Sequence, residues 1–127
     1  MAEIKISDLS IGDWVRFEGK PYKVICIEKW RPNYVVVLEG WGEIYTRGIK
    51  SIEPIPLTPK ILEKNGFEIV DESADFQLYG SPECSIFFTK GTVRYLLETP
   101  QASVVCWNVH QLQHALRLAG VEKEIEL

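Results

Sequence analysis

Hydrophobic and polar residues alternate along the first half of the chain with the period of two that indicates β-strands. In "DWVRFEGKPYKVICIE", Val15 and Phe17 alternate with polar neighbours, and Gly19-Lys20 offers a tight turn into a second strand that contains Tyr22 and Val24. The stretch "NYVVVLEGWGEIYTR" repeats the pattern on both sides of the turn "EGWG". The pattern therefore predicts four strands that follow one another as a meander.

A fifth strand is predicted just before a proline-rich break. The segment "GIKSIEPI", residues 48–55, is long enough for one tight turn and a short strand, and Pro54 and Pro56 then end the sheet. Five short strands in about 50 residues suit a small SH3-like β-barrel, which closes on itself and so hides its edges. We therefore predict an SH3-like five-stranded barrel over residues 1–55.

Residues 56–127 have a different sequence pattern, with helix signals at both ends and strand candidates between them, which predicts an α+β domain. Thr58 is placed as a helix N-cap, Pro59 at the first helical position and Gly66 just after the end of about two turns. Four strand candidates follow, with Lys90-Gly91 as a hairpin turn between the last two: "FEIV", "FQLYG", "SIFFT" and "TVRYLLE". The expected order is a helix, three or four antiparallel strands and a C-terminal helix.

The C-terminal helix is expected to begin after Asn108, with Gln111 completing a capping box, and to end at Gly120. It carries His110 and His114 at the four-residue spacing of a zinc-binding helix. A helical period of 3.6 places the histidines on the side away from the core, opposite Val109, Leu112, Ala115, Leu116 and Ala119. The general base of zinc proteases is replaced by Gln111, and the further ligands that a structural zinc needs are lacking, so we expect a polar face and no metal.

Composition limits the function classes. The chain has 127 residues, of which 46% are hydrophobic, and a net charge of -4. Residues 1–56 carry eight charges of each sign, so the acidic excess lies in the second half, and the basic face of a duplex-binding protein is missing. Without a signal-like start or a long apolar run, we expect a cytoplasmic protein with no membrane contact. Cys26, Cys84 and Cys106 are interpreted as reduced packing residues.

The aromatic residues of the first half suggest a binding surface. In a meander, the start of the first strand, the connection between the second and third strands and the end of the fourth strand lie at one end. We therefore expect five residues to converge there: Trp14, Trp30, Arg31, Tyr34 and Arg47. Trp41 falls at the opposite end. Tryptophan beside arginine is typical of surfaces that stack on rings or bind anions, whereas the alternative is that these side chains plug the barrel or pack on the second half.

The chain as a whole resembles a group of small uncharacterised proteins encoded by phages, prophages and mobile elements of gut Bacteroidetes. The segments that carry the resemblance are "LSIGDWVRFEGKPYKV", "IEPIPLTPKILEKNGF" and "VHQLQHALRLAG", which together extend over most of its length. The resemblance implies binders that act in host takeover or in evasion of host defence, and it transfers no functional residue.

These observations favour a non-catalytic binding module over an enzyme. No nucleophile–base set, cofactor motif or calcium loop is present in the sequence: Gly40 and Gly42 fit a hairpin turn, and Asp71, Glu72 and Asp75 fit a solvated turn. The expected partner is a host protein or a small anionic, nucleotide-like ligand, and no cofactor is expected. The alternative is a single-stranded nucleic-acid-binding protein, because small barrels also bind strands through aromatic stacking, although the charge does not favour it.

Overall fold

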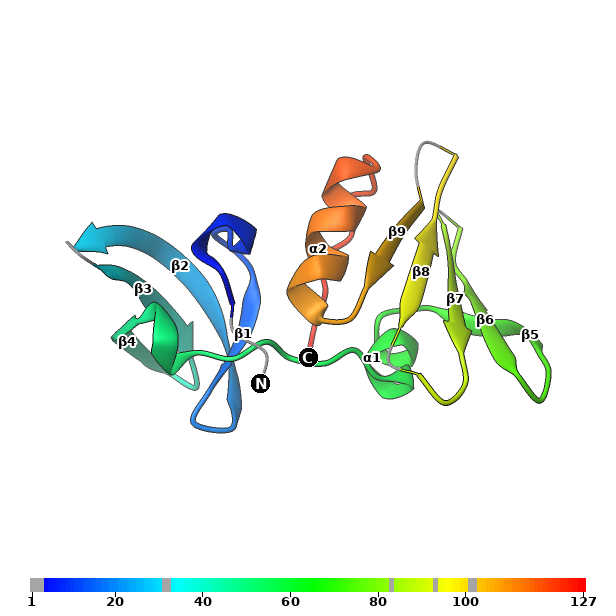
Figure 1. The fold of residues 1–127 in the computed structure, drawn as a ribbon, viewed down its shortest axis with the longest axis horizontal. Helices are drawn as coiled ribbons and strands as arrows, with labels where there is room; N and C mark the ends of the chain where they lie inside the picture. Colours follow the sequence, from blue (N-terminus) through cyan, green and yellow to red (C-terminus); the bar gives the residue numbers. More distant parts are fainter. Residues whose placement is uncertain (1–3, 31–32, 83, 93, 101–102) are drawn as a thin grey trace. The chain divides into compact units, whose positions relative to one another are not determined.

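The computed structural model describes residues 4–30, 33–82, 84–92, 94–100 and 103–127. The chain divides into two compact units, residues 1–55 and residues 56–127. Each unit is built around its own antiparallel sheet, and each is described here by itself (Figure 1). The fold is therefore mixed, with two sheets and few helices.

The N-terminal unit contains a four-stranded meander. Its strands are β1 (Trp14–Phe17), β2 (Lys20–Trp30), β3 (Asn33–Gly40) and β4 (Glu43–Gly48), and neighbours in the chain are neighbours in the sheet. Two single-turn 3-10 helices flank the strands, η1 (Ile6–Asp8) before β1 and η2 (Ile49–Ser51) after β4. Alternation along each strand directs one row of side chains into the core of this unit, as the sequence pattern predicts.

Two hairpin turns of the sheet place non-glycine residues in the left-handed region. Glu18 and Gly19 have φ values of 50° and 78°, and Trp41 and Gly42 have values of 58° and 74°. Positive φ at both central residues is the pattern of a type I′ turn, whose twist matches that of the strands it joins. The first turn lies one residue earlier than the predicted Gly19-Lys20, because Lys20 already pairs with Phe17.

The predicted fifth strand over residues 48–55 is wrong. The segment forms η2 instead. Its only strand-like pairing among the described residues is one isolated bridge, in which the backbones of Arg16 and Glu53 exchange two hydrogen bonds of 2.8 Å. Ile52, only 3% exposed, is held by packing of its side chain. The described residues therefore form a four-stranded sheet, and no closed barrel is found among them.

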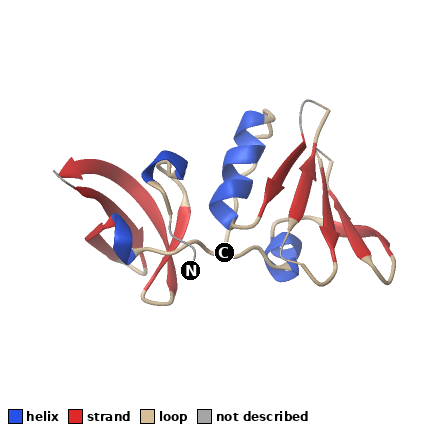
Figure 2. Cartoon of the chain, viewed as in Figure 1, coloured by secondary structure: helices blue, strands red, loops and turns tan. Residues whose placement is uncertain are grey.

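The C-terminal unit begins with a short helix and ends with a longer one. Helix α1 (Pro59–Lys64) leads into β5 (Glu68–Glu72), β6 (Phe76–Gly80), β7 (Ser85–Thr89), β8 (Tyr95–Glu98) and β9 (Ser103–Cys106), and α2 (Val109–Leu118) follows. The five strands are antiparallel and adjacent in chain order (Figure 2). The α+β architecture agrees with the sequence, but "SVVC" forms an additional strand that the pattern did not predict.

The sheet of the C-terminal unit has one closed face and one open face. Tyr79, Ile86 and Leu97 pair side by side across β6, β7 and β8 and are at most 1% exposed. Burial raises the pKa of Tyr79, with smaller contributions from the carboxylates of Glu63 and Glu72. Residues that alternate with these, such as Phe87 and Leu96, point to the other face and are only half-buried.

The helix ends follow the signals in the sequence. The Thr58 hydroxyl accepts a hydrogen bond of 3.3 Å from the Ile61 backbone N–H, with Pro59 at the first helical position. At α2, the Gln111 side chain accepts hydrogen bonds from the backbone N–H groups of Trp107 and Asn108. These two helices have six and ten residues, and within the described part of the chain no helix is long and apolar enough to cross a membrane.

Candidate functional site

The tip of the β2–β3 hairpin projects beyond the rest of the N-terminal sheet. Strand β1 pairs with β2 as far as Lys23, the residues just before β1 continue the backbone hydrogen bonds to Val24, and β4 pairs with β3 as far as Val35. Beyond these residues β2 and β3 pair with each other alone, through Lys29 with Tyr34 and Trp30 with Asn33. The chain therefore presents a two-stranded extension that ends at Trp30, next to Arg31 in the sequence.

Trp30 lies exposed on one side of this extension. Its side chain is 58% exposed, and its Nε1 donates a hydrogen bond of 2.8 Å to the carboxylate of Glu28, two residues earlier on the same side of the strand. On the other side, the Lys29 ammonium lies 5.7 Å from the centroid of the Tyr34 ring. Trp30 and Tyr34 thus lie at the same end of the sheet but on its two sides, so their side chains do not converge as predicted, and Arg31 lies outside the described residues.

The predicted convergence of Trp14 with these residues is wrong. Trp14 pairs with Lys23, seven residues before Trp30 on β2, which corresponds to about 23 Å along a strand. Its ring lies 5.2 Å from the Lys23 ammonium. The sequence argument placed Trp14 at the β2–β3 end because it took the strands to be of equal length, whereas β2 has eleven residues and β1 has four.

Arg47 also lies away from the tip, on the core side of the sheet. It pairs with Val36, and its guanidinium is 5.1 Å from the Phe17 ring centroid and 4.9 Å from that of Tyr45. Phe17, Tyr22 and Tyr45 form a cluster with centroid separations of 5.6 to 5.8 Å. Arg47 therefore caps an aromatic cluster of the core instead of extending a binding surface at the hairpin tip.

Trp41 occupies a second exposed position, at the opposite end of the sheet from Trp30. It is 64% exposed in a left-handed conformation that L-residues with large side chains rarely adopt. Its Nε1 donates a hydrogen bond of 3.0 Å to the Pro21 carbonyl, and the Lys20 ammonium lies 5.4 Å from the centroid of its ring. The dipeptide Trp41-Gly42 between two strand patterns was the available signal for this turn.

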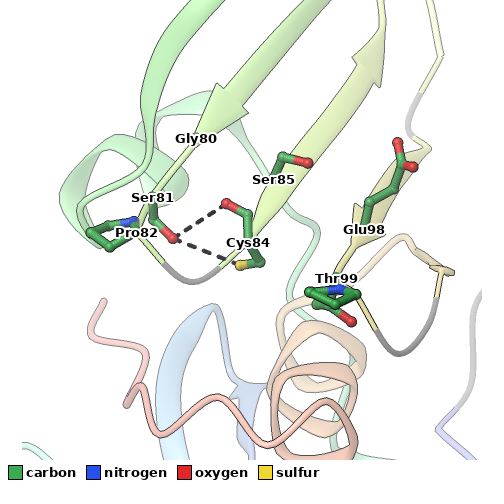
Figure 3. A pocket seen from close by; sticks show the side chains of 8 residues that line it. Gly80, Ser81, Pro82, Cys84, Ser85, Glu98 and Thr99 are labelled. Carbon is green, nitrogen blue, oxygen red and sulfur yellow. Dashed lines mark hydrogen bonds between the residues drawn. The ribbon is translucent and has the colours of Figure 1, made fainter.

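A hollow in the C-terminal unit lies where β6 joins β7 and where β8 ends (Figure 3). It has a volume of about 430 Å³ and is lined by Gly80, Ser81, Pro82, Cys84, Ser85, Glu98, Thr99 and Pro100. The Ser81 hydroxyl donates a hydrogen bond of 3.4 Å to the Cys84 carbonyl and is 3.7 Å from its Sγ, and the Glu98 carboxylate points away from both. Since the Ser81 backbone N–H also bonds to the Cys84 carbonyl, these contacts close the β6–β7 connection.

The three cysteines are present as thiols, with no disulfide between them. Cys84 and Cys106 are buried, and the Cys26 thiol donates a hydrogen bond to Glu28, with the Cys26 Sγ 3.7 Å from the Glu28 Oε1. Burial raises the pKa of Cys106 to about 12, so its thiolate is scarce at neutral pH. This position is therefore suited to packing and not to nucleophilic chemistry.

The expectation that both histidines of α2 face away from the core is wrong for His110. His110 is 3% exposed and belongs to the packed face of the helix, whereas His114 is half-buried. Their rings meet edge to face with centroids 5.9 Å apart. Within the described ranges, no group of three or more His, Cys, Asp or Glu side chains is arranged to hold a metal ion.

The chain was compared with known proteins at three levels. No protein-family model, no curated protein and no solved structure matches it.

Proposed function

We propose that the protein is a non-catalytic binding module that recognises a partner protein through the tip of its β2–β3 hairpin. The observation that carries the proposal is the exposed indole of Trp30, held by Glu28 at the end of a projecting two-stranded extension. Tryptophan is enriched among residues that dominate binding energy, because it buries a large area at a small cost in conformational entropy.

The shape of the tip favours a protein over a small ligand. Small-molecule sites are concave, whereas Trp30 ends a projection. The Glu28 carboxylate accepts the hydrogen bond of the Trp30 indole on the same side of the hairpin, whereas the Lys29 side chain lies on the other side. The complementary surface is therefore an apolar pocket of a folded protein with polar groups at its rim. The resemblance to phage and mobile-element proteins supports a host protein of the cytoplasm as that partner.

The finer fold of the N-terminal unit is part of the same proposal. In an SH3-like arrangement, the segment after the fourth strand returns to pair with the first strand. The bridge between Arg16 and Glu53 follows η2 and joins these two segments, and their side chains add an ion pair of 3.6 Å. These contacts support an SH3-like barrel whose closure is confined to one bridge.

The experiment compares two exposed tryptophans in capture of host protein from a lysate. Trp30→Ala should abolish capture of a defined protein partner while the unfolding transition stays unchanged, because more than half of the side chain is already in solvent. Trp41→Ala is the matched control, since Trp41 is similarly exposed at the other end of the sheet. Capture that is equally strong or equally lost in both variants would exclude the tip as the site.

The same captured complex tests the alternative that the chain binds single-stranded nucleic acid. A protein complex should survive nuclease treatment and change only moderately with salt. If the captured species is a nucleic acid, and its binding to wild-type protein falls steeply as salt rises, the chain binds strands by stacking and charge instead.

A further inference from the structure

The open face of the C-terminal sheet carries an apolar band that crosses four strands. Residue pairing places Leu78, Phe87, Leu96 and Val105 in one row across β6, β7, β8 and β9. Phe76, at the start of β6, stacks on Phe87 with centroids 5.1 Å apart and an interplanar angle of 24°. These side chains are half-buried and alternate with those of the closed face. The unit therefore has an apolar sheet face that is partly exposed to solvent.

Polar residues of opposite charge border this band at its two ends. Along β8, Arg94, Leu96 and Glu98 lie on the same face because side chains alternate, so the cation and the anion are about 13 Å apart with leucine between them. Both charged side chains are exposed. At the Glu98 end the band is bordered by small residues, Gly80 and Ser85, and at the Arg94 end by Phe76 and Thr89.

We infer that this face binds a second copy of the same chain, sheet to sheet, about a two-fold axis that runs between the sheets at right angles to the strands. Such an axis lays each strand over itself in the reverse direction. Arg94 of one copy then faces Glu98 of the other, and the reverse contact forms as well. An axis parallel to the strands would instead bring residues of the same end together, so the Arg94 and Glu98 pair of β8 favours the first arrangement. Asp71, which pairs with Leu78 at the β5 edge of the same face, then faces its own copy and limits the contact to β6–β9.

The sizes of the side chains agree with the same arrangement. Phe76 comes to lie opposite Gly80, where the Val70 side chain covers the open position: Val70 is 63% exposed, and its Cγ1 is 3.1 Å from the site of a Cβ on Gly80. Thr89 comes to lie opposite Ser85, and Leu96 opposite itself. The residues of the central row, Leu78, Phe87, Leu96 and Val105, each face their own copy, so the two apolar bands cover each other.

A hollow in this face fits the acidic residue of the second copy. It has a volume of about 250 Å³ and is lined by Phe87, Thr89, Thr92, Arg94, Tyr95, Leu96 and Val105. In the two-fold arrangement, Glu98 of the second copy enters it beside Arg94. The apolar lining shields this ion pair from solvent, so its attraction exceeds that of an exposed pair.

The area of the face sets the strength of the dimer. Four strands, each about 4.8 Å wide and about five residues long, give a face of about 19 by 17 Å. Two such faces cover about 650 Å² in total, which is the size of a weak, transient interface. We therefore expect a monomer–dimer equilibrium that shifts across the micromolar range, to be measured by sedimentation equilibrium of the full chain from about 1 to about 100 µM.

Charge reversal tests the register of this dimer. Arg94→Glu alone and Glu98→Arg alone each oppose like charges at both ends of the interface and should weaken dimerisation by about tenfold or more. An equal mixture of the two variant chains should restore it, because each reversed residue then meets its opposite in the other chain. Both positions are exposed, so folding should be unchanged, and thermal unfolding of each variant monitors this.

Lys60→Glu on α1 is the matched control, since it changes the net charge as Arg94→Glu does and lies outside the open face. It should leave the dissociation constant unchanged. A wild-type chain that stays monomeric at about 100 µM would overturn the inference. A dimer that is insensitive to both reversals, or that is not restored in the mixture, would overturn it too, because it would be formed through another surface.

Discussion

The indole Nε1 of Trp41 donates a hydrogen bond of 3.0 Å to the carbonyl oxygen of Pro21 and so ties the tip of the β3–β4 hairpin to β2. This contact is formed by a residue with φ of 58°, a conformation that costs most L-residues about 1 kcal/mol. The turn therefore combines local strain with a stabilising contact, and the two effects can be separated by substitution.

Trp41→Asn and Trp41→Ala both remove the indole and its hydrogen bond to Pro21. Asparagine tolerates the left-handed region and forms the preferred Asn-Gly pair of a type I′ turn, whereas alanine keeps the strain. The asparagine variant should therefore be more stable than the alanine variant by about 1 kcal/mol in urea unfolding. Equal stability of the two would show that the turn is not strained in the wild type.

The protein should lose stability in alkaline solution. Burial raises the pKa of Cys106 from 9.0 to about 12 and that of Tyr95 from 10.0 to about 12. Between pH 9 and pH 12 the unfolded chain releases protons from these two groups that the folded chain retains. The contribution of the two groups to the free energy of unfolding is therefore complete below about pH 9 and is lost as the pH rises towards 12. Urea unfolding at several pH values across this window measures the slope.

Cys106→Ala provides the control for that measurement. The variant is less stable at neutral pH because it leaves a small cavity, but its stability should fall less steeply above pH 9, since one of the protons that the folded chain retains is gone. A slope identical to that of the wild type would mean that Cys106 does not titrate with unfolding.

Short-range patterns in the sequence predicted where strands occur, but they could not predict strand lengths, which depend on long-range pairing. Alternation around Val15, Phe17 and Val24 identified strands because one face of each is buried, and this holds for any partner strand. The length of β2 depends on how far β3 continues to pair with it, which no local pattern reports. The position of Trp14 relative to Trp30 was therefore wrong: Trp14 does begin the first strand, as predicted, but Trp30, expected in the connection after the second strand, is the last residue of β2.

Packing from outside an element accounts for two other differences. Ile52 is buried through its side chain while the backbone around it forms only one bridge, so an apolar run was taken for a strand. His110 was assigned to a polar face by helical period, but α2 is covered over a wide arc that also includes Ala115 and Leu116. The width of a covered face depends on what packs against a helix, not on its own sequence.

The two histidines of α2 should respond differently to substitution. His110 is 3% exposed, so His110→Ala leaves a cavity and should destabilise the fold by about 1 to 3 kcal/mol. His114→Ala removes a half-buried ring and should cost about 1 kcal/mol or less. Urea unfolding of both variants and of the double variant measures these costs, and equal small effects would place His110 in solvent.

Asn65 should hold the C-terminal segment in place. It lies at the end of α1 and is 8% exposed. Its side-chain amide donates hydrogen bonds of 2.8 Å to the carbonyls of Ile61 and Glu126. Its Oδ1 accepts a hydrogen bond of 2.7 Å from the Glu126 backbone N–H. Asn65→Ala removes three hydrogen bonds at once and should cost about 3 kcal/mol. Hydrogen exchange of the Glu126 amide should accelerate more than exchange of core amides, because the segment that contains buried Ile125 opens locally.

Two further variants separate this role of Asn65 from the stability of α1 itself. Thr58→Ala removes the cap at the other end of the helix and should cost about 1 kcal/mol without selective exposure of the Glu126 amide. Asn65→Asp keeps the acceptor but points a carboxylate at two carbonyl oxygens, which raises the pKa of that carboxyl in the folded state. Its stability should therefore recover as the pH falls, when the protonated group can donate again. Uniform acceleration of all amides in Asn65→Ala would show that Asn65 stabilises the unit as a whole and does not fasten its C-terminal segment.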